Sequence, residues 1–151
     1  MLTDWALASL HHLAVFSLAA VIAAEIAIMN ANLNARSISR LAKIDLWYGI
    51  LATLVVVFGV ARVVWGAKGY EYYLANHIFW TKMILFLAVG LLSIQPTLRY
   101  IAWGRTLRSD AAFLPAATEV GRVRMYLWIE AGLFLCIPIA AAAMARGYGL
   151  A

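Results

Sequence analysis

The sequence has one cysteine, few acidic residues and no basic segment at its start. A single thiol, Cys136, excludes an internal disulfide and a thiolate metal cluster. The sequence contains no CxxCH motif, so any haem would be held noncovalently. Asp4 is the only charged residue before the first histidine. The N-terminus therefore lacks the basic region of a signal peptide, and we expect its apolar segment to stay attached.

Charged residues make up only 13% of the chain, whereas 66% of its residues are hydrophobic, which is too apolar for a soluble domain. A helix of ~20 apolar residues crosses ~30 Å of hydrocarbon. The sequence predicts such helices at about 5–30, 46–66, 77–100 and 125–145, and Pro96 is expected to kink or close the third. Short loops make successive helices antiparallel. We therefore predict an all-α fold, an integral membrane up-and-down four-helix bundle that forms one domain over residues 1–151.

The basic residues lie mainly in two of the three connecting segments, and short cytoplasmic loops are typically rich in lysine and arginine. The first segment has Arg36, Arg40 and Lys43, the third has Arg105, Arg108, Arg122 and Arg124, and the second has Lys68 alone. This pattern predicts a multi-pass protein of the bacterial inner membrane with both termini outside. Orientation and contact with the lipid bilayer explain the net charge of +5, so we expect no nucleic-acid partner.

Several titratable residues fall at similar depths in the outer half of the predicted bundle. These are His11, His12, Arg62, His77 and Lys82. Titratable groups are costly in hydrocarbon and usually face the interior of a bundle, where they mark functional sites. At 100° per residue, His11 and Glu25 lie about 40° apart around the first helix, and His12 points away from Glu25. The sequence therefore predicts one polar layer in the outer half.

A second set of polar residues lies toward the cytoplasmic ends of the predicted helices. It consists of Glu25, Asp45, Tyr48, Arg99 and Glu130. One interpretation is that Glu25 and Glu130 close the inner end of the bundle or relay protons. The other is that they pair with arginines such as Arg99, Arg36 or Arg40 and fasten the helix ends together.

The outer layer has the side chains that a haem or a copper ion would need. Neutral imidazole ligates b-type haem iron, an amine can also ligate iron, and arginine suits the haem propionates. We therefore expect His12 or His11 as the axial ligand, Lys82 or His77 opposite it or steering a substrate, and Arg62 on a carboxylate. Copper is the rival cofactor, and its candidate ligands are His11, His12 and either Met83 or Met144.

Motifs along nearly the whole chain resemble those of a bacterial family of small predicted membrane proteins of unknown function. They are HHLAVF at 11–16, Glu25, D-x-x-Y-G at 45–49, GVAR at 59–62, NHIFWTK at 76–82 and SIQPTLRY at 93–100. More remotely, the layout is similar to the HemJ-type protoporphyrinogen IX oxidase and to the membrane domain of CopD-type copper-resistance proteins.

The likeness to the HemJ type implies a functional pair. In that type, a histidine on the first helix and a lysine that follows a tryptophan on the third are associated with b-type haem. His12 or His11 and Lys82, two residues after Trp80, occupy similar places here. The chain has AAEIAIMN where the oxidase has a tyrosine-leucine-proline-arginine segment, so the resemblance implies haem or porphyrin binding more than it implies the oxidase activity.

The sequence thus predicts a membrane protein that binds haem b or a porphyrin and works in redox chemistry, with Lys82 and Arg62 as candidate catalytic residues. Such a role implies an electron-transfer partner in the membrane. One alternative is a noncatalytic accessory subunit of a larger membrane complex. Another is a metal-ion or small-solute transport protein, which at this size would act as a homo-oligomer.

Overall fold

A computed structural model describes residues 2–150 of the chain, and the ends of the predicted domain, Met1 and Ala151, lie outside the described residues. The described part contains helices and no strand. The helices are α1 (Leu2–Asn30), α2 (Ala35–Trp65), α3 (Gly69–Leu74), α4 (His77–Ser109) and α5 (Ala117–Ala145). All except α3 are long and apolar enough to cross a membrane. The predicted all-α fold with four membrane-spanning helices is confirmed.

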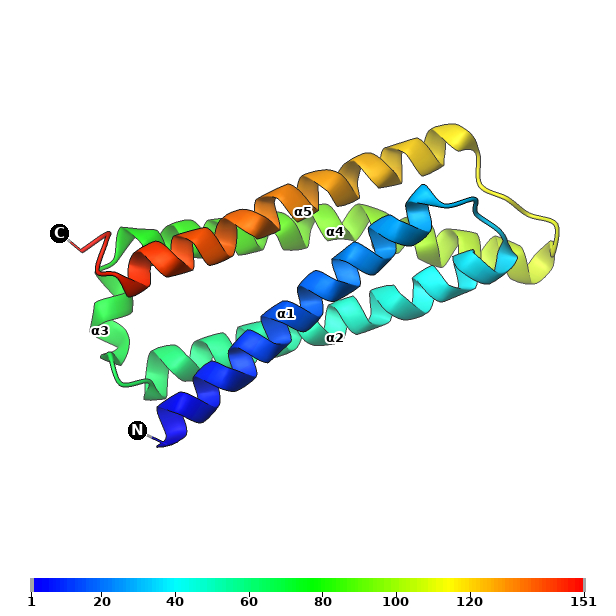
Figure 1. Ribbon diagram of the computed structural model, residues 1–151. Helices are drawn as coiled ribbons and strands as arrows, with labels where there is room; N and C mark the ends of the chain where they lie inside the picture. Colours follow the sequence, from blue (N-terminus) through cyan, green and yellow to red (C-terminus); the bar gives the residue numbers. More distant parts are fainter. Residues whose placement is uncertain (1, 151) are drawn as a thin grey trace.

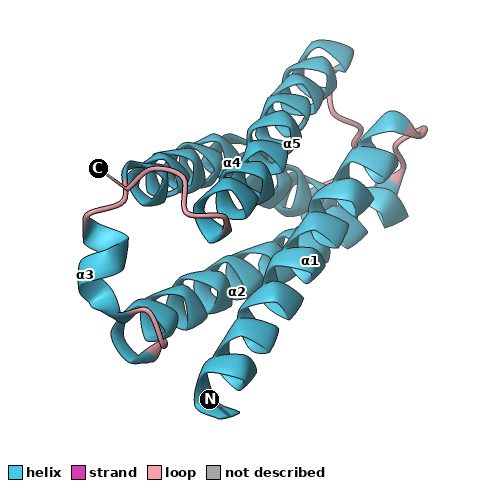
Figure 2. Ribbon diagram, turned by 60° about the vertical axis from the view of Figure 1, so that its left-hand side comes forward, coloured by secondary structure: helices cyan, strands magenta, loops and turns pink. Residues whose placement is uncertain are grey.

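The four long helices form two antiparallel hairpins, α1–α2 and α4–α5, which lie side by side (Figure 1). Between the hairpins, α1 packs against α5 and α2 packs against α4. Both termini lie at one end of the bundle, where the hairpins diverge and α3 spans from one to the other (Figures 1 and 2). We call this end the outer end and the opposite one the inner end.

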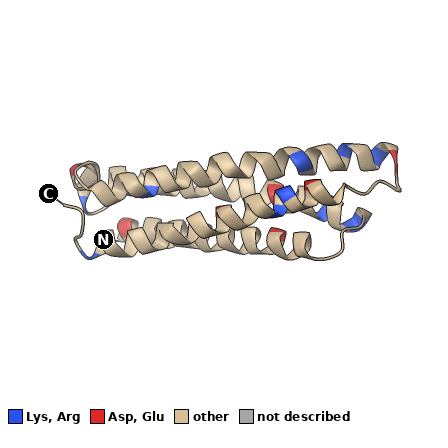
Figure 3. Cartoon of the chain, turned by 90° about the horizontal axis from the view of Figure 1, so that it is seen from above, with Lys and Arg blue, Asp and Glu red and all other residues tan. Residues whose placement is uncertain are grey.

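The helices extend beyond the predicted apolar segments at the inner end. The sequence predicted that α2 begins near residue 46, but it begins at Ala35, where Asn34 and Ser37 form a capping box that satisfies free backbone groups. Helix α4 continues through Pro96 to Ser109, so the proline does not close it. Packing in a bundle lets a membrane helix tolerate a proline. Most of the basic residues lie on these extensions (Figure 3).

Two apolar layers fill the interior of the bundle. The outer apolar layer is built on Ala14, Leu18, Ile22, Val55, Val89 and Phe134. The inner apolar layer is built on Met29, Ile38, Leu41, Trp103, Val123 and Leu127. On each long helix, the polar residues predicted for the inner half come between the residues of the outer apolar layer and those of the inner apolar layer along the chain. On α1, Leu18 of the outer apolar layer and Glu25 are both buried.

The outer end is held together by Asn76, which is fully buried just before α4. Its side-chain oxygen accepts from the backbone N–H of Ile78, 2.9 Å away, and caps the helix. Its amide nitrogen donates to the carbonyl oxygen of Tyr148 at 3.0 Å. The hydroxyl of Tyr72 in α3 donates to the carbonyl oxygen of Met144 at 3.0 Å. These bonds join α3, the start of α4 and the C-terminal segment.

Candidate functional site

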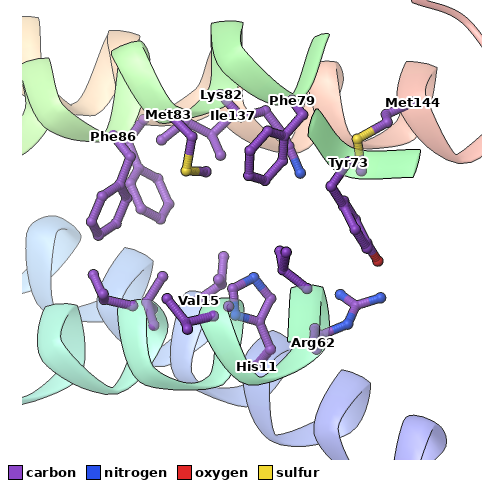
Figure 4. Close-up of a pocket in the computed structure, with 16 residues that line it drawn as sticks. His11, Val15, Arg62, Tyr73, Phe79, Lys82, Met83, Phe86, Ile137 and Met144 are labelled. Atoms are coloured by element: carbon purple, nitrogen blue, oxygen red, sulfur yellow. The ribbon is translucent and has the colours of Figure 1, made fainter. Parts of the chain in front are cut away.

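A cavity of about 280 Å³ lies between the two hairpins toward the outer end, and we call it the outer cavity. All five helices contribute side chains to it. His11 comes from α1, Arg62 from α2, Tyr73 from α3, Lys82 from α4 and Met144 from α5. Figure 4 shows these side chains directed into the space between the hairpins. The divergence of the hairpins above the outer apolar layer creates this space.

Three of the five residues predicted for the outer layer meet in this cavity. His11, Arg62 and Lys82 all line it. The Nδ1 of His11 and the Nε of Arg62 are buried and have no hydrogen-bond partner within residues 2–150. Lys82 places its Nζ 5.8 Å from the centroid of the Phe79 ring. The cavity therefore combines one imidazole and two cationic side chains, which together favour a ligand with carboxylates or other anionic groups.

The other two predicted residues lie outside the cavity. His12 is exposed on the outer surface of α1, where its ring stacks on Phe16 with a centroid distance of 6.4 Å. His77 is exposed at the first position of α4. His77 therefore does not join His11, Arg62 and Lys82 in lining the cavity. The structure thus distinguishes His11 from His12 as the histidine that faces the interior.

His11 is seated over a glycine of the neighbouring helix. A Cβ added to Gly59 would lie 3.4 Å from Cε1 of His11, so the imidazole packs directly against the α2 backbone. A bulkier residue at 59 would occupy the place of the ring. The glycine of the GVAR motif therefore lets α1 approach α2 closely and fixes the position of His11.

The remaining wall of the cavity is apolar and aromatic. Phe79 and Phe86 of α4 face valines of α2 across it, and Met83 points into the space between them (Figure 4). Three lining residues, Val56, Val60 and Met83, are 48%, 57% and 41% exposed. The cavity is therefore open to the surroundings on the side formed by α2 and α4. Met83 and Met144 also line the cavity, together with His11 but without His12. A copper ion in the cavity would therefore have one imidazole ligand where the sequence predicted two.

The inner polar residues form a second group, which we call the inner polar cluster: Glu25, Asp45, Tyr48, Thr97, Tyr100 and Glu130. Glu25 and Glu130 are 2% and 1% exposed. Thr97 donates to Asp45 with an oxygen–oxygen distance of 2.7 Å. Arg99 does not join the cluster, because its guanidinium pairs with Glu119 at 3.0 Å. The predicted pairing of Arg99 with Glu25 or Glu130 is therefore wrong.

Sequence reasoning missed residues in both sites and also a residue that lies beside the inner polar cluster. Tyr73 lines the outer cavity from α3, a helix that the sequence did not predict. Tyr100 is fully buried in the inner polar cluster. Glu119 takes Arg99 out of that cluster and also accepts from the indole nitrogen of Trp103 at 3.3 Å. A tyrosine among apolar residues of a membrane helix, one turn after Pro96, was the available signal for Tyr100.

The fold and the outer cavity define a small membrane protein with four candidate membrane spans and an open cavity between its two hairpins. Residues 3–149 match the family described as predicted membrane protein (DUF2214), and the chain belongs to that family. No curated protein and no solved structure matches the chain. The family description gives a membrane location and no activity, so a role for the site is inferred from its chemistry.

Proposed function

We propose that this protein binds haem b, or another porphyrin, in the outer cavity and works in redox chemistry at the bacterial inner membrane. The observation that carries this proposal is the meeting of His11, Arg62 and Lys82 in a cavity whose other walls are apolar and aromatic. A porphyrin has the matching chemistry, because it is a flat apolar molecule with carboxylates at one edge. When bound, its iron supplies one-electron redox chemistry.

The residues of the cavity fit such a molecule. His11 would ligate the metal, since it is the histidine that lines the cavity and its imidazole is packed between α1 and α2. Arg62 and Lys82 would bind the carboxylates, and Phe79 and Phe86 would pack against the ring. On this proposal Lys82 and Arg62 also hold the carboxylates of a porphyrin substrate.

The size and opening of the cavity are consistent with a ligand that reaches the lipid. Small-molecule pockets usually enclose roughly 300–1,000 Å³, and the outer cavity encloses about 280 Å³. A larger flat molecule would therefore extend through the opening beside Val56, Val60 and Met83, where its apolar edge meets hydrocarbon. Such an edge is accessible to an electron-transfer partner within the membrane.

The distribution of basic residues supports an orientation of the protein in the membrane. The arginine- and lysine-rich extensions lie at the inner end, opposite both termini (Figure 3). Basic residues near the ends of membrane helices favour the cytoplasmic side. We place the inner end in the cytoplasm, so the outer cavity lies in the outer half of the membrane.

Filling the cavity from Gly59 tests whether it is the binding site. In Gly59→Leu the new side chain occupies space beside His11, so a bound haem would have to share it. If the resulting strain in the complex is similar to that of an overpacked core, about 1–3 kcal/mol, the haem affinity falls roughly five- to hundredfold. The matched control is Gly49→Leu on the same helix, where an added Cβ meets nothing within 4 Å. Haem titrations of the detergent-purified variants, followed by absorption, measure the difference. Equal haem affinity in both variants would contradict binding in this cavity.

A further inference from the structure

The inner polar cluster is enclosed on both sides by apolar layers. Toward the outer end, Leu18 and Ile22 of the outer apolar layer separate it from the outer cavity. Toward the inner end, Met29 and Leu127 of the inner apolar layer close it off. The carboxyl groups of Glu25 and Glu130 therefore lie in the interior of the bundle, away from both ends.

The groups around these carboxyls supply no positive charge. Glu25 is approached by Asp45 of α2, Tyr100 of α4 and Glu130 of α5, and Tyr48 lies beside Glu130. Within residues 2–150, no lysine, arginine or histidine pairs with Glu25 or Glu130. Two arginines of the inner half are engaged elsewhere. Arg99 pairs with Glu119, and Arg124 donates to the carbonyl oxygen of Met29 at 2.7 Å.

A second observation, independent of the acidic residues, is the hydroxyl of Tyr100. Its residue is 0% exposed, and the hydroxyl faces Glu25 and lies near Asp45 and Glu130. No hydrogen bond of good geometry satisfies it in the described part of the chain, and the same holds for the Oε1 of Glu25 and of Glu130, although the hydroxyls of Tyr100 and Tyr48 lie beside these two carboxyls. Poorly satisfied buried polar atoms are rare in folded proteins and commonly mark a bound water, an ion or a group that takes part in function. These atoms can both donate to and accept from a group held among the carboxyls.

Carboxylates without a counter-charge are strongly disfavoured in such a place. Removing an ion from water costs several kcal/mol when no partner compensates. The cluster must therefore bind positive charge as protons or as a metal cation. Across residues 2–150, no three carboxyl, imidazole or thiol side chains are arranged to hold a metal ion. Protons need no such arrangement, because each carboxylate takes up one proton on an oxygen and becomes a neutral acid.

We propose that the inner polar cluster is an enclosed proton-binding site, in which Glu25 and Glu130 hold exchangeable protons at neutral pH with Tyr48 and Tyr100 as their hydrogen-bonding neighbours. Asp45, which is only half-buried and accepts from Thr97, is the member nearest to the surroundings. This site does not depend on the outer cavity or on any cofactor there.

Infrared spectroscopy of the purified protein without added haem tests this proposal. A protonated carboxyl has a C=O stretching band that is separate from the carboxylate bands and shifts in D₂O. We expect the wild-type protein to have this band at neutral pH and to lose part of it in Glu25→Gln, part in Glu130→Gln and nearly all in the double variant. Glu119→Gln is the matched control, because Glu119 is half-exposed and paired with Arg99, and it should keep the whole band.

Three results would overturn the proposal. They are the absence of the band from folded wild-type protein, its persistence at full strength in the double variant, and its disappearance when sodium chloride replaces choline chloride. The last result would assign the site to a metal cation. If a variant does not fold, the presence or absence of the band in the wild-type protein still tests whether protonated carboxyls are present.

Discussion

Replacing His11 by alanine is expected to abolish haem binding, whereas replacing the adjacent His12 by alanine should leave it intact. The two residues are chemically identical neighbours, but His11 lines the outer cavity and His12 stacks on Phe16 at the surface. Loss of a residue that only hydrogen-bonds to a metal ligand commonly weakens a metal site by about 10–100-fold. Loss of the ligand itself should exceed that range, and a haem titration followed by absorption measures it.

This pair of variants carries its own control. Each removes one imidazole from the same turn of α1, so similar helix content and a single size-exclusion peak would show that both remain folded. Unchanged affinity in His11→Ala would remove this residue from its proposed role. Loss of binding in His12→Ala alone would mean that α1 is rotated relative to the structure.

The second large effect concerns the two cations of the cavity. In the double variant Arg62→Gln and Lys82→Gln, the affinity for a porphyrin with free carboxylates should fall sharply. Each charge-assisted hydrogen bond is worth about 1.5–3 kcal/mol, or roughly ten- to hundredfold in affinity. The affinity for the dimethyl ester of the same porphyrin should change little, because the ester has no anionic group to lose a partner.

Fluorescence quenching by the two porphyrins in detergent solution measures this difference. The wild-type protein should prefer the free acid over the ester, and the double variant should bind both alike. Arg105→Gln with Arg108→Gln, which removes two exposed charges from the inner end of α4, serves as the charge-matched control. An equal preference for the free acid in the wild-type protein and in the Arg62/Lys82 variant would contradict carboxylate binding by these residues.

Hydrophobic composition was sufficient to predict the number and order of the spanning helices, because long apolar segments are the strongest signal in a membrane protein. It was insufficient to predict their ends. The extensions of α2 and α5 are rich in arginine, which is a good helix former, and a helix can continue into water after its apolar part ends. The start of α2 is determined by the local capping box of Asn34 and Ser37.

The composition of the outer cavity could be predicted only in part. The depth of a residue along a helix follows from counting residues, and this count correctly predicted that His11, Arg62 and Lys82 lie at a similar depth. Rotation of each helix about its axis depends on packing, such as the contact of His11 with Gly59, and determines that His11 faces inward. His77 has the right depth but lies at the exposed first position of α4.

The charge environment of Glu25 and Glu130 depends on the partner of Arg99, which the depth of the residues in the membrane does not determine. The sequence offered Arg99 as a partner for Glu25 or Glu130, since all three lie near the inner end. Glu119, in the first turn of α5, binds Arg99 instead. This contact exists because α5 begins eight residues before its predicted start near 125. Because the predicted start of α5 was too late, the sequence did not indicate that the inner polar cluster lacks a positively charged partner.

The central claim, that the outer cavity holds a haem, is tested most directly by the absorption spectrum of the detergent-purified protein. The spectrum is recorded after oxidation in air and again after reduction with dithionite, with haem offered during purification. We predict the sharp reduced bands of a b-type haem, extractable without covalent attachment. A featureless spectrum from folded protein to which haem has been offered would contradict the claim.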